Sequence, residues 1–111
     1  MIEKLNPPGI VTPLNNAYHH AVVIPPNARL CYVAGQVGMR ADGSTPESLE
    51  EQAEQAWRNV MACVEAAGMS AQNVVKINAY LVDAADYPAF AAARSKYLGD
   101  ARPASTAILI K

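Results

Sequence analysis

The side chains with chemical potential in this chain are two adjacent histidines, two separate cysteines and a serine near the end. His19 and His20 lie in a strand-like run, so their side chains point to opposite faces and cannot chelate one metal ion. Cys31 and Cys63 stand in no metal-binding spacing. No motif pairs Ser105 or Cys31 with a base. We therefore expect no metal and no cofactor, and the catalytic residues stay unassigned.

Composition limits the class of protein. The 111 residues fit a single domain, 1–111, and a 51% hydrophobic content with 17% charged residues is typical of a globular chain. The net charge of −1 comes from scattered basic residues, which argues against a nucleic-acid partner. No run is long enough to span a membrane, and the first residues have no signal-peptide core. We expect a cytoplasmic protein with reduced, mostly buried cysteines and no membrane association.

The first third of the chain reads as an irregular arm followed by short strands. The β-branched and aromatic runs Tyr18–Ile24 and Arg29–Ala34 flank a "PPNA" turn, which predicts a hairpin. A short edge strand is expected at Val37–Met39. The arm before Tyr18 is rich in Pro, Gly and Asn and predicts no regular element.

Two helices and two further strands follow. Thr45 and Pro46 predict the start of an amphipathic helix, and Gly68 predicts its left-handed end. The apolar stripe expected on this helix is Leu49, Ala53, Ala56, Val60, Val64 and Ala67.

Alternating residues predict a half-buried strand over Asn73–Val82. Asp86 predicts the cap of a second helix that ends at Gly99, and Pro103 leads into a last strand, Ala104–Ile110. The second helix is expected to bury Tyr87, Phe90, Ala91, Tyr97 and Leu98. The order β-β-(β)-α-β-α-β predicts a two-layer α+β sandwich, with both helices on one face of a mixed sheet.

Several segments together resemble one known family. The runs "YHHAVVI", "LCYVAGQVGM", "EAAGMSAQNVVKINAYLVD", "YPAFAAARSKYL" and "RPASTAILI" are similar to the Rid family, the reactive-intermediate deaminases also called YjgF-like proteins. The resemblance covers Tyr18 to Ile110. It implies a chorismate-mutase-like fold, a homotrimer, and small-molecule clefts between subunits. It also implies a further strand after Ile110, so we expect that a short C-terminal strand is missing from this sequence.

The resemblance assigns ligand-binding positions only where this sequence matches. Tyr18 corresponds to a pocket tyrosine, and Gly35 and Gln36 to the loop after the second strand. Ala34 stands where deaminases often have serine, and Ala91 where an asparagine is expected. Tyr18 is alternatively a core or interface aromatic, and Gly35 and Gln36 alternatively only shape a turn.

The largest departure is Ser105. Deaminases of the family carry an arginine there that binds the carboxylate of a 2-imino acid, whereas this chain reads "PAST". One hydroxyl cannot replace a bidentate guanidinium, so we expect a more neutral pocket and a bulkier or uncharged ligand. Arg102, on the opposite face of an extended chain, is not expected to compensate, and the position of Arg40 leaves its role open. Ser105 is alternatively a tolerated small residue in an unused cleft.

Three functions remain open. The first is an imine or enamine deaminase with altered specificity, and the second is a non-catalytic small-molecule binder or regulatory trimer. The third, a ribonuclease, is the least favoured because the charge is balanced.

Overall fold

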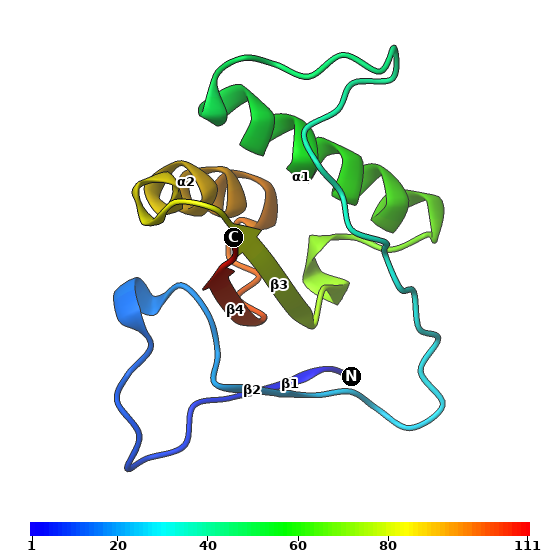
Figure 1. Cartoon of the computed structure of the whole chain (residues 1–111). Helices are drawn as coiled ribbons and strands as arrows, with labels where there is room; N and C mark the ends of the chain where they lie inside the picture. Colours follow the sequence, from blue (N-terminus) through cyan, green and yellow to red (C-terminus); the bar gives the residue numbers. More distant parts are fainter.

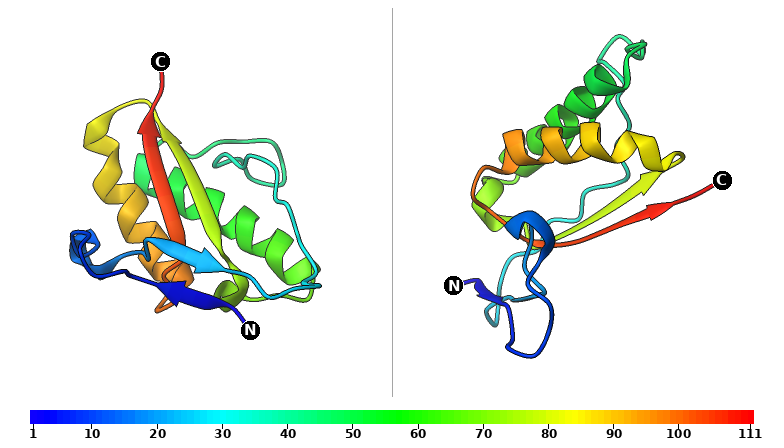
Figure 2. Two further views of the ribbon diagram at one scale, coloured as in Figure 1. Left: turned by 90° about the horizontal axis from the view of Figure 1, so that it is seen from below. Right: turned by 90° about the vertical axis from the view of Figure 1, so that its left-hand side faces the viewer.

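Two α-helices cover one face of a pair of parallel strands, and a second pair of strands lies on the side away from the helices (Figure 1). The computed structural model describes residues 1–111. The helices and strands are β1 (Glu3–Leu5), β2 (Ala21–Val23), α1 (Leu49–Ala66), β3 (Lys76–Leu81), α2 (Tyr87–Leu98) and β4 (Ala104–Leu109). The side view on the right of Figure 2 shows the same layers. The α+β class is therefore confirmed, with two helices on one face.

Strands β3 and β4 run parallel, with Lys76 opposite Ala104 and Leu81 opposite Leu109. Side chains alternate between the two faces of this pair. Ile77 and Leu81 are half-buried and Ala79 is buried, all toward the helices, whereas Lys76 and Tyr80 are exposed. The alternation predicted for Asn73–Val82 is confirmed over β3.

The core lies where α1 crosses α2. Its buried residues are Trp57, Ala93 and Leu98, and Phe90 stacks on Trp57 with ring centroids 6.4 Å apart. The predicted α1 stripe contains Val64, which is buried, but it omitted Trp57, which fills the centre of the core. At the surface, an ion pair between Glu54 and Lys96 joins the two helices. The hydrogen bond from Lys96 lowers the pKa of Glu54, and the same bond raises the pKa of Lys96.

The ends of α1 show one correct expectation and one wrong one. Gly68 adopts a φ of 75°, its amide donates to Glu65, and the amide of Met69 donates to Val64, which is the Schellman pattern. The predicted start at Thr45 and Pro46 is wrong, because the helix begins at Leu49. The hydroxyl of Ser48, not Thr45, caps it by accepting from the Glu51 amide at 3.2 Å.

The predicted hairpin is wrong. Residues 29–34 form no strand, and β2 pairs instead, antiparallel, with β1, which lies in the arm that was expected to be irregular. The segment after β2 runs along α1: Arg29 donates to the Ala67 carbonyl at 2.8 Å, which satisfies one of the last carbonyls of that helix. Cys31 is exposed there, contrary to the expectation of a buried thiol.

The loop that follows packs directly on α1. The side chain of Asn59 donates to the carbonyls of Val37 and Met39, at 3.2 and 2.9 Å, so these residues form no edge strand. Gly38 between them is buried against the helix backbone. A Cβ at Gly38 would lie 2.4 Å from the carbonyl oxygen of Gln52, which is closer than real Cβ atoms approach.

We expect Gly38→Ala to destabilise the protein by about 1–3 kcal/mol, because the loop must move off α1 and lose the Asn59 bonds. Gly35→Ala is the matched control, since a Cβ there meets nothing within 4 Å and its φ is not positive. Urea unfolding of both variants measures the difference. Equal midpoints for the two would contradict the close packing of Gly38.

Candidate ligand-binding site

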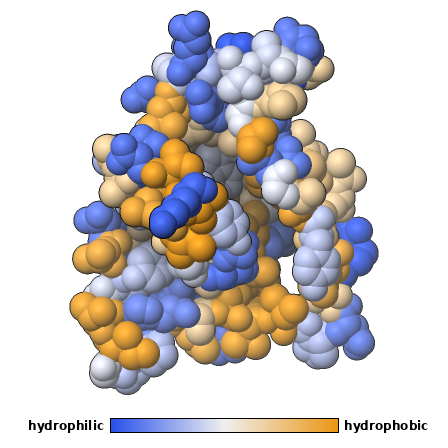
Figure 3. Space-filling view, in the orientation of Figure 1, coloured by the Kyte–Doolittle hydropathy of each residue, from blue (hydrophilic) through white to orange (hydrophobic).

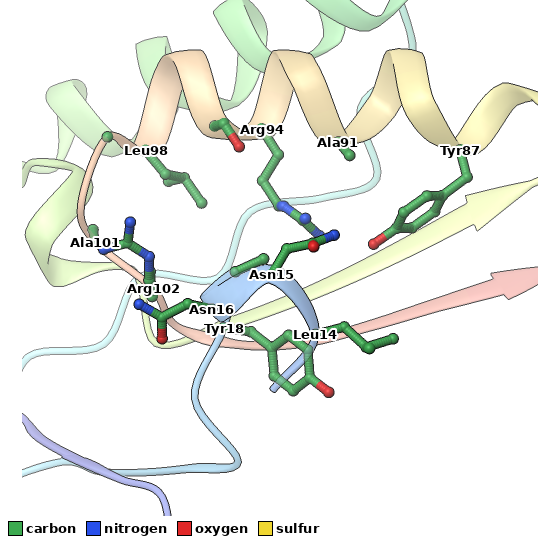
Figure 4. Close-up of a pocket in the computed structure, with 13 residues that line it drawn as sticks. Leu14, Asn15, Asn16, Tyr18, Tyr87, Ala91, Arg94, Leu98, Ala101 and Arg102 are labelled. Carbon is green, nitrogen blue, oxygen red and sulfur yellow. The ribbon is translucent and has the colours of Figure 1, made fainter. Parts of the chain in front are cut away.

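A pocket of about 360 Å³ opens between the turn before Tyr18 and the inner side of α2 (Figure 4). The chain segment between α2 and β4 closes one end of it. The lining residues are Leu14, Asn15, Asn16, Ala17, Tyr18, Tyr87, Ala91, Arg94, Ser95, Leu98, Gly99, Ala101 and Arg102. Two widely separated segments of the sequence, residues 14–18 and 87–102, therefore contribute to one concave site.

One side of α2 supplies the pocket wall. Tyr87, Ala91, Arg94 and Leu98 follow one another at four- and three-residue steps, which places them in one row on a helix. Phe90, Ala93 and Tyr97 form the neighbouring row, which packs on the Trp57 core. The inner stripe expected from the sequence mixed these two rows, because α2 is apolar on both.

The opposite wall is a short turn. Residues Leu14–Asn16 form a 3₁₀ turn in which Asn15 and Asn16 adopt φ angles of 54° and 52°. Asparagine tolerates this left-handed conformation better than most residues. The turn is closed by the Asn16 amide on the Pro13 carbonyl, at 3.0 Å. It carries Tyr18 to the pocket, where Tyr18 also meets the edge of the His20 ring.

His19 connects this turn to the segment before β4. Its amide donates to the Pro103 carbonyl at 3.2 Å, and its ring Nδ1 lies 2.5 Å from the Arg102 carbonyl. A carbonyl only accepts, so Nδ1 carries the proton in this contact. Pro103 is fully buried. These contacts hold the backbone of Arg102, and so the base of its side chain, at the end of the pocket.

The pocket carries two guanidinium groups and no carboxylate. Arg94 is only 6% exposed and reaches from α2 into the pocket, with its guanidinium over the rings of Tyr87 and Phe90 at 5.9 and 5.2 Å. No salt bridge or hydrogen bond joins its guanidinium to another protein group. Arg102 is half-buried and donates to the Asp100 carbonyl at 3.4 Å.

The residues predicted for the site fall in three places. Tyr18 and Ala91 line the pocket. Ala34, Gly35 and Gln36 are exposed in the loop before α1, where Gln36 donates only to Ala34, at 3.4 Å.

Ser105 is half-buried on β4 opposite Ile77, outside the pocket lining. Arg102, which precedes β4, lines the pocket, whereas Ser105 does not, and whether Arg102 compensates for the arginine expected at Ser105 stays untested. The pocket that Tyr18 and Ala91 line therefore carries positive charge and is not neutral. Arg94 was missed, although an arginine within the apolar run "AFAAARSKYL" was a visible signal.

Other kinds of site find less support in the structure. No group of three or more His, Cys, Asp or Glu side chains is placed to hold a metal ion. None of the helices combines the length and apolar content that crossing a bilayer requires.

The structure is that of an α+β protein with a pocket beside the crossover helix α2. The profile of the family described as Endoribonuclease L-PSP matches residues 11–111, so the chain belongs to this family, which is also known as the Rid or YjgF-like family.

Known proteins support the assignment. The crystal structure of YyfB from Yersinia pestis, a Rid-family protein of unknown function, superposes with a TM-score of 0.85 at 25% identity, covering 99% of this chain and 86% of YyfB. A RutC family protein of Pyrococcus horikoshii is 32% identical over 81 residues, 69% of this chain and 63% of its own length. A 2-iminobutanoate/2-iminopropanoate deaminase of Dermatophagoides farinae is 30% identical over 79 residues, which cover 69% of this chain and 62% of that protein. The match thus spans less than two thirds of the length of these two relatives.

We expect His19→Ala to loosen the segment before β4, because it removes the ring contact with Arg102. The loss is on the order of 1 kcal/mol. Hydrogen exchange should speed up at the amides of Ala101 and Ala104. His20→Ala is the control: its ring contacts the Val11 carbonyl instead, so exchange should change only in the N-terminal arm. The same exchange pattern in both variants would contradict this role of His19.

Proposed function

We propose that this protein hydrolyses a small imine or enamine in the pocket beside α2. The observation that carries the proposal is the presence of Tyr18 and Ala91, two positions assigned to ligand binding by the family resemblance, in one pocket with polar side chains and two cations. The relative from Dermatophagoides farinae, named as a 2-iminobutanoate/2-iminopropanoate deaminase, supports the same reaction type.

The reaction adds water to the C=N carbon, breaks the C–N bond and releases ammonia together with a carbonyl product. The pocket lining holds no Asp, Glu or His that could act as a general base. The protein therefore contributes by positioning. The hydroxyls of Tyr18 and Ser95 and the amides of Asn15 and Asn16 can orient a water molecule against the bound imine.

We also propose a homotrimer in which neighbouring copies cover the open face of β3 and β4. Tyr80 and Ile108 lie opposite each other on this face and are 60% and 46% exposed. Figure 3 shows apolar side chains gathered around the centre of one side of the molecule, where the C-terminal end lies, and along its lower edge. A monomer rarely leaves such a surface in water. The exposed residues Ala34, Gly35 and Gln36 would then contribute to a cleft with a neighbouring copy.

Two other functions remain as alternatives, and the experiments below distinguish them from imine hydrolysis. A protein that binds ligands in the pocket without turning over any imine would be the non-catalytic binder on the same scaffold. A ribonuclease fits less well, because a chain of net charge −1 with scattered basic residues has little to bind a phosphate backbone. Salt-sensitive RNA binding would favour it.

We expect imine turnover to depend on the space beside Ala91. Imines are generated in the assay from a panel of amino acids by an amino-acid oxidase, and the surviving imine is trapped with semicarbazide. The wild-type protein should accelerate imine hydrolysis and so lower the amount of trapped imine. Ala91→Phe should abolish this acceleration, because the phenylalanine ring fills the pocket. Ala92→Phe should keep it, since Ala92 is exposed and does not line the pocket. Acceleration that survives in Ala91→Phe would place the reaction elsewhere.

We expect light scattering to give about three times the chain mass of 11.8 kDa at micromolar concentration. Ile108→Asp should shift the protein to smaller species, because it buries a charge in the proposed interface. Val11→Asp, at another exposed apolar position in the N-terminal arm, should leave the mass unchanged. A wild-type monomer would refute the trimer.

A further inference from the structure

We propose that the pocket selects a short dicarboxylate, with one carboxylate bound by Arg94 and the other by Arg102. This inference rests on the proposed function, because it names the class of ligand that the same pocket takes. An imine of an acidic amino acid, with two carboxylates on a short chain, is the corresponding substrate.

The first step of the argument is the charge of Arg94. Arginine stays protonated in proteins, and an unpaired charge that is removed from water is costly. Arg94 is only 6% exposed, and the two salt bridges of the structure use other residues, but its guanidinium nitrogens are not fully buried and keep contact with solvent. The rings of Tyr87 and Phe90 stabilise the cation from one side only, so its donors remain available on the pocket side.

The second step is that a second guanidinium shares the pocket. Arg102 comes from the segment after α2, whereas Arg94 comes from the helix itself, and Figure 4 shows their guanidinium groups in different parts of the site. The single long hydrogen bond from Arg102 to Asp100 leaves most of its donors free. The Asp100 carboxylate accepts from Gln72 and forms no salt bridge with Arg102.

The third step is the absence of any compensating acid in the lining. A ligand with one carboxylate would neutralise one guanidinium and leave the other unpaired. A ligand with two carboxylates neutralises both, each through charge-assisted hydrogen bonds. The volume of about 360 Å³ lies at the small end of ligand pockets, which favours a short chain between the two acids. Leu14 and Leu98 provide apolar contacts for that chain.

The test compares three ligands of nearly the same shape, namely succinate, succinamate and succinamide, which carry two, one and no negative charges. Isothermal calorimetry with the wild-type protein should give the tightest binding for succinate, with each replaced carboxylate weakening affinity by about tenfold or more. None of the three is an imine. Their binding therefore does not depend on turnover, and a failure of the proposed reaction would leave this result intact.

Variants then assign each charge. Arg94→Met keeps a side chain of similar length on the Phe90 ring, and it should bind succinate about as weakly as the wild type binds succinamate. Arg102→Met, at a half-buried position, should weaken succinate binding to a similar extent. It provides the test of the proposal if Arg94→Met does not fold. Arg58→Met is the control, because Arg58 is exposed on α1 and does not line this pocket. It should bind succinate like the wild type.

Two results would overturn the proposal. One is equal affinity of the wild type for succinate and succinamate, which would mean that only one cation is used. The other is unchanged succinate affinity in folded Arg94→Met or Arg102→Met. Imine turnover that persists alongside either result would keep the proposed function and reject only the dicarboxylate preference.

Discussion

The parallel pairing of β3 and β4 is the constraint on which the rest of the structure depends. Parallel neighbours cannot be joined by a tight turn, so the chain must return along the sheet before β4 can begin. Helix α2 makes this return. One row of its side chains then packs on α1 around Trp57, and the adjacent row is left facing the N-terminal turn. The pocket wall is thus a consequence of the crossover, and Arg94 and Arg102 follow from where α2 runs and where it ends.

The N-terminal arm completes the site through very few contacts. Strands β1 and β2 pair only with each other, and the backbone bond from His19 to Pro103 joins them to the segment before β4. The ring of His19 reinforces this junction at Arg102. The turn that carries Asn15 and Tyr18 is therefore positioned relative to α2 mainly by the same residues that fix Arg102. The contacts of His19 with Arg102 and Pro103 therefore position both the N-terminal wall of the pocket and the Arg102 cation.

Local signals in the sequence were enough for the elements whose pattern is local. The period of α1, the left-handed Gly68 and the alternation of β3 were all predicted, because each depends on neighbouring residues. The pairing of β2 was not predicted. Residues 29–34 have a strand-forming composition, but the composition does not reveal that Arg29 donates to the Ala67 carbonyl at the end of α1. The resemblance placed Tyr18 and Ala91, which the pocket brings together. Arg94 and Arg102 required the fold, because eight positions separate them in sequence and only the end of α2 brings them to one cavity.

Arg94 and Arg102 line the pocket at positions that the family resemblance did not assign to ligand binding. The family resemblance predicts an arginine at the position of Ser105 on β4, and from the sequence alone the site was therefore expected to be neutral. The structure supplies positive charge from α2 and from the segment after it, two elements that approach the cavity from other directions. A carboxylate held there would lie differently with respect to the sheet than one held from β4. The ligand is therefore better inferred from where cations lie in space than from which residue occupies one strand position.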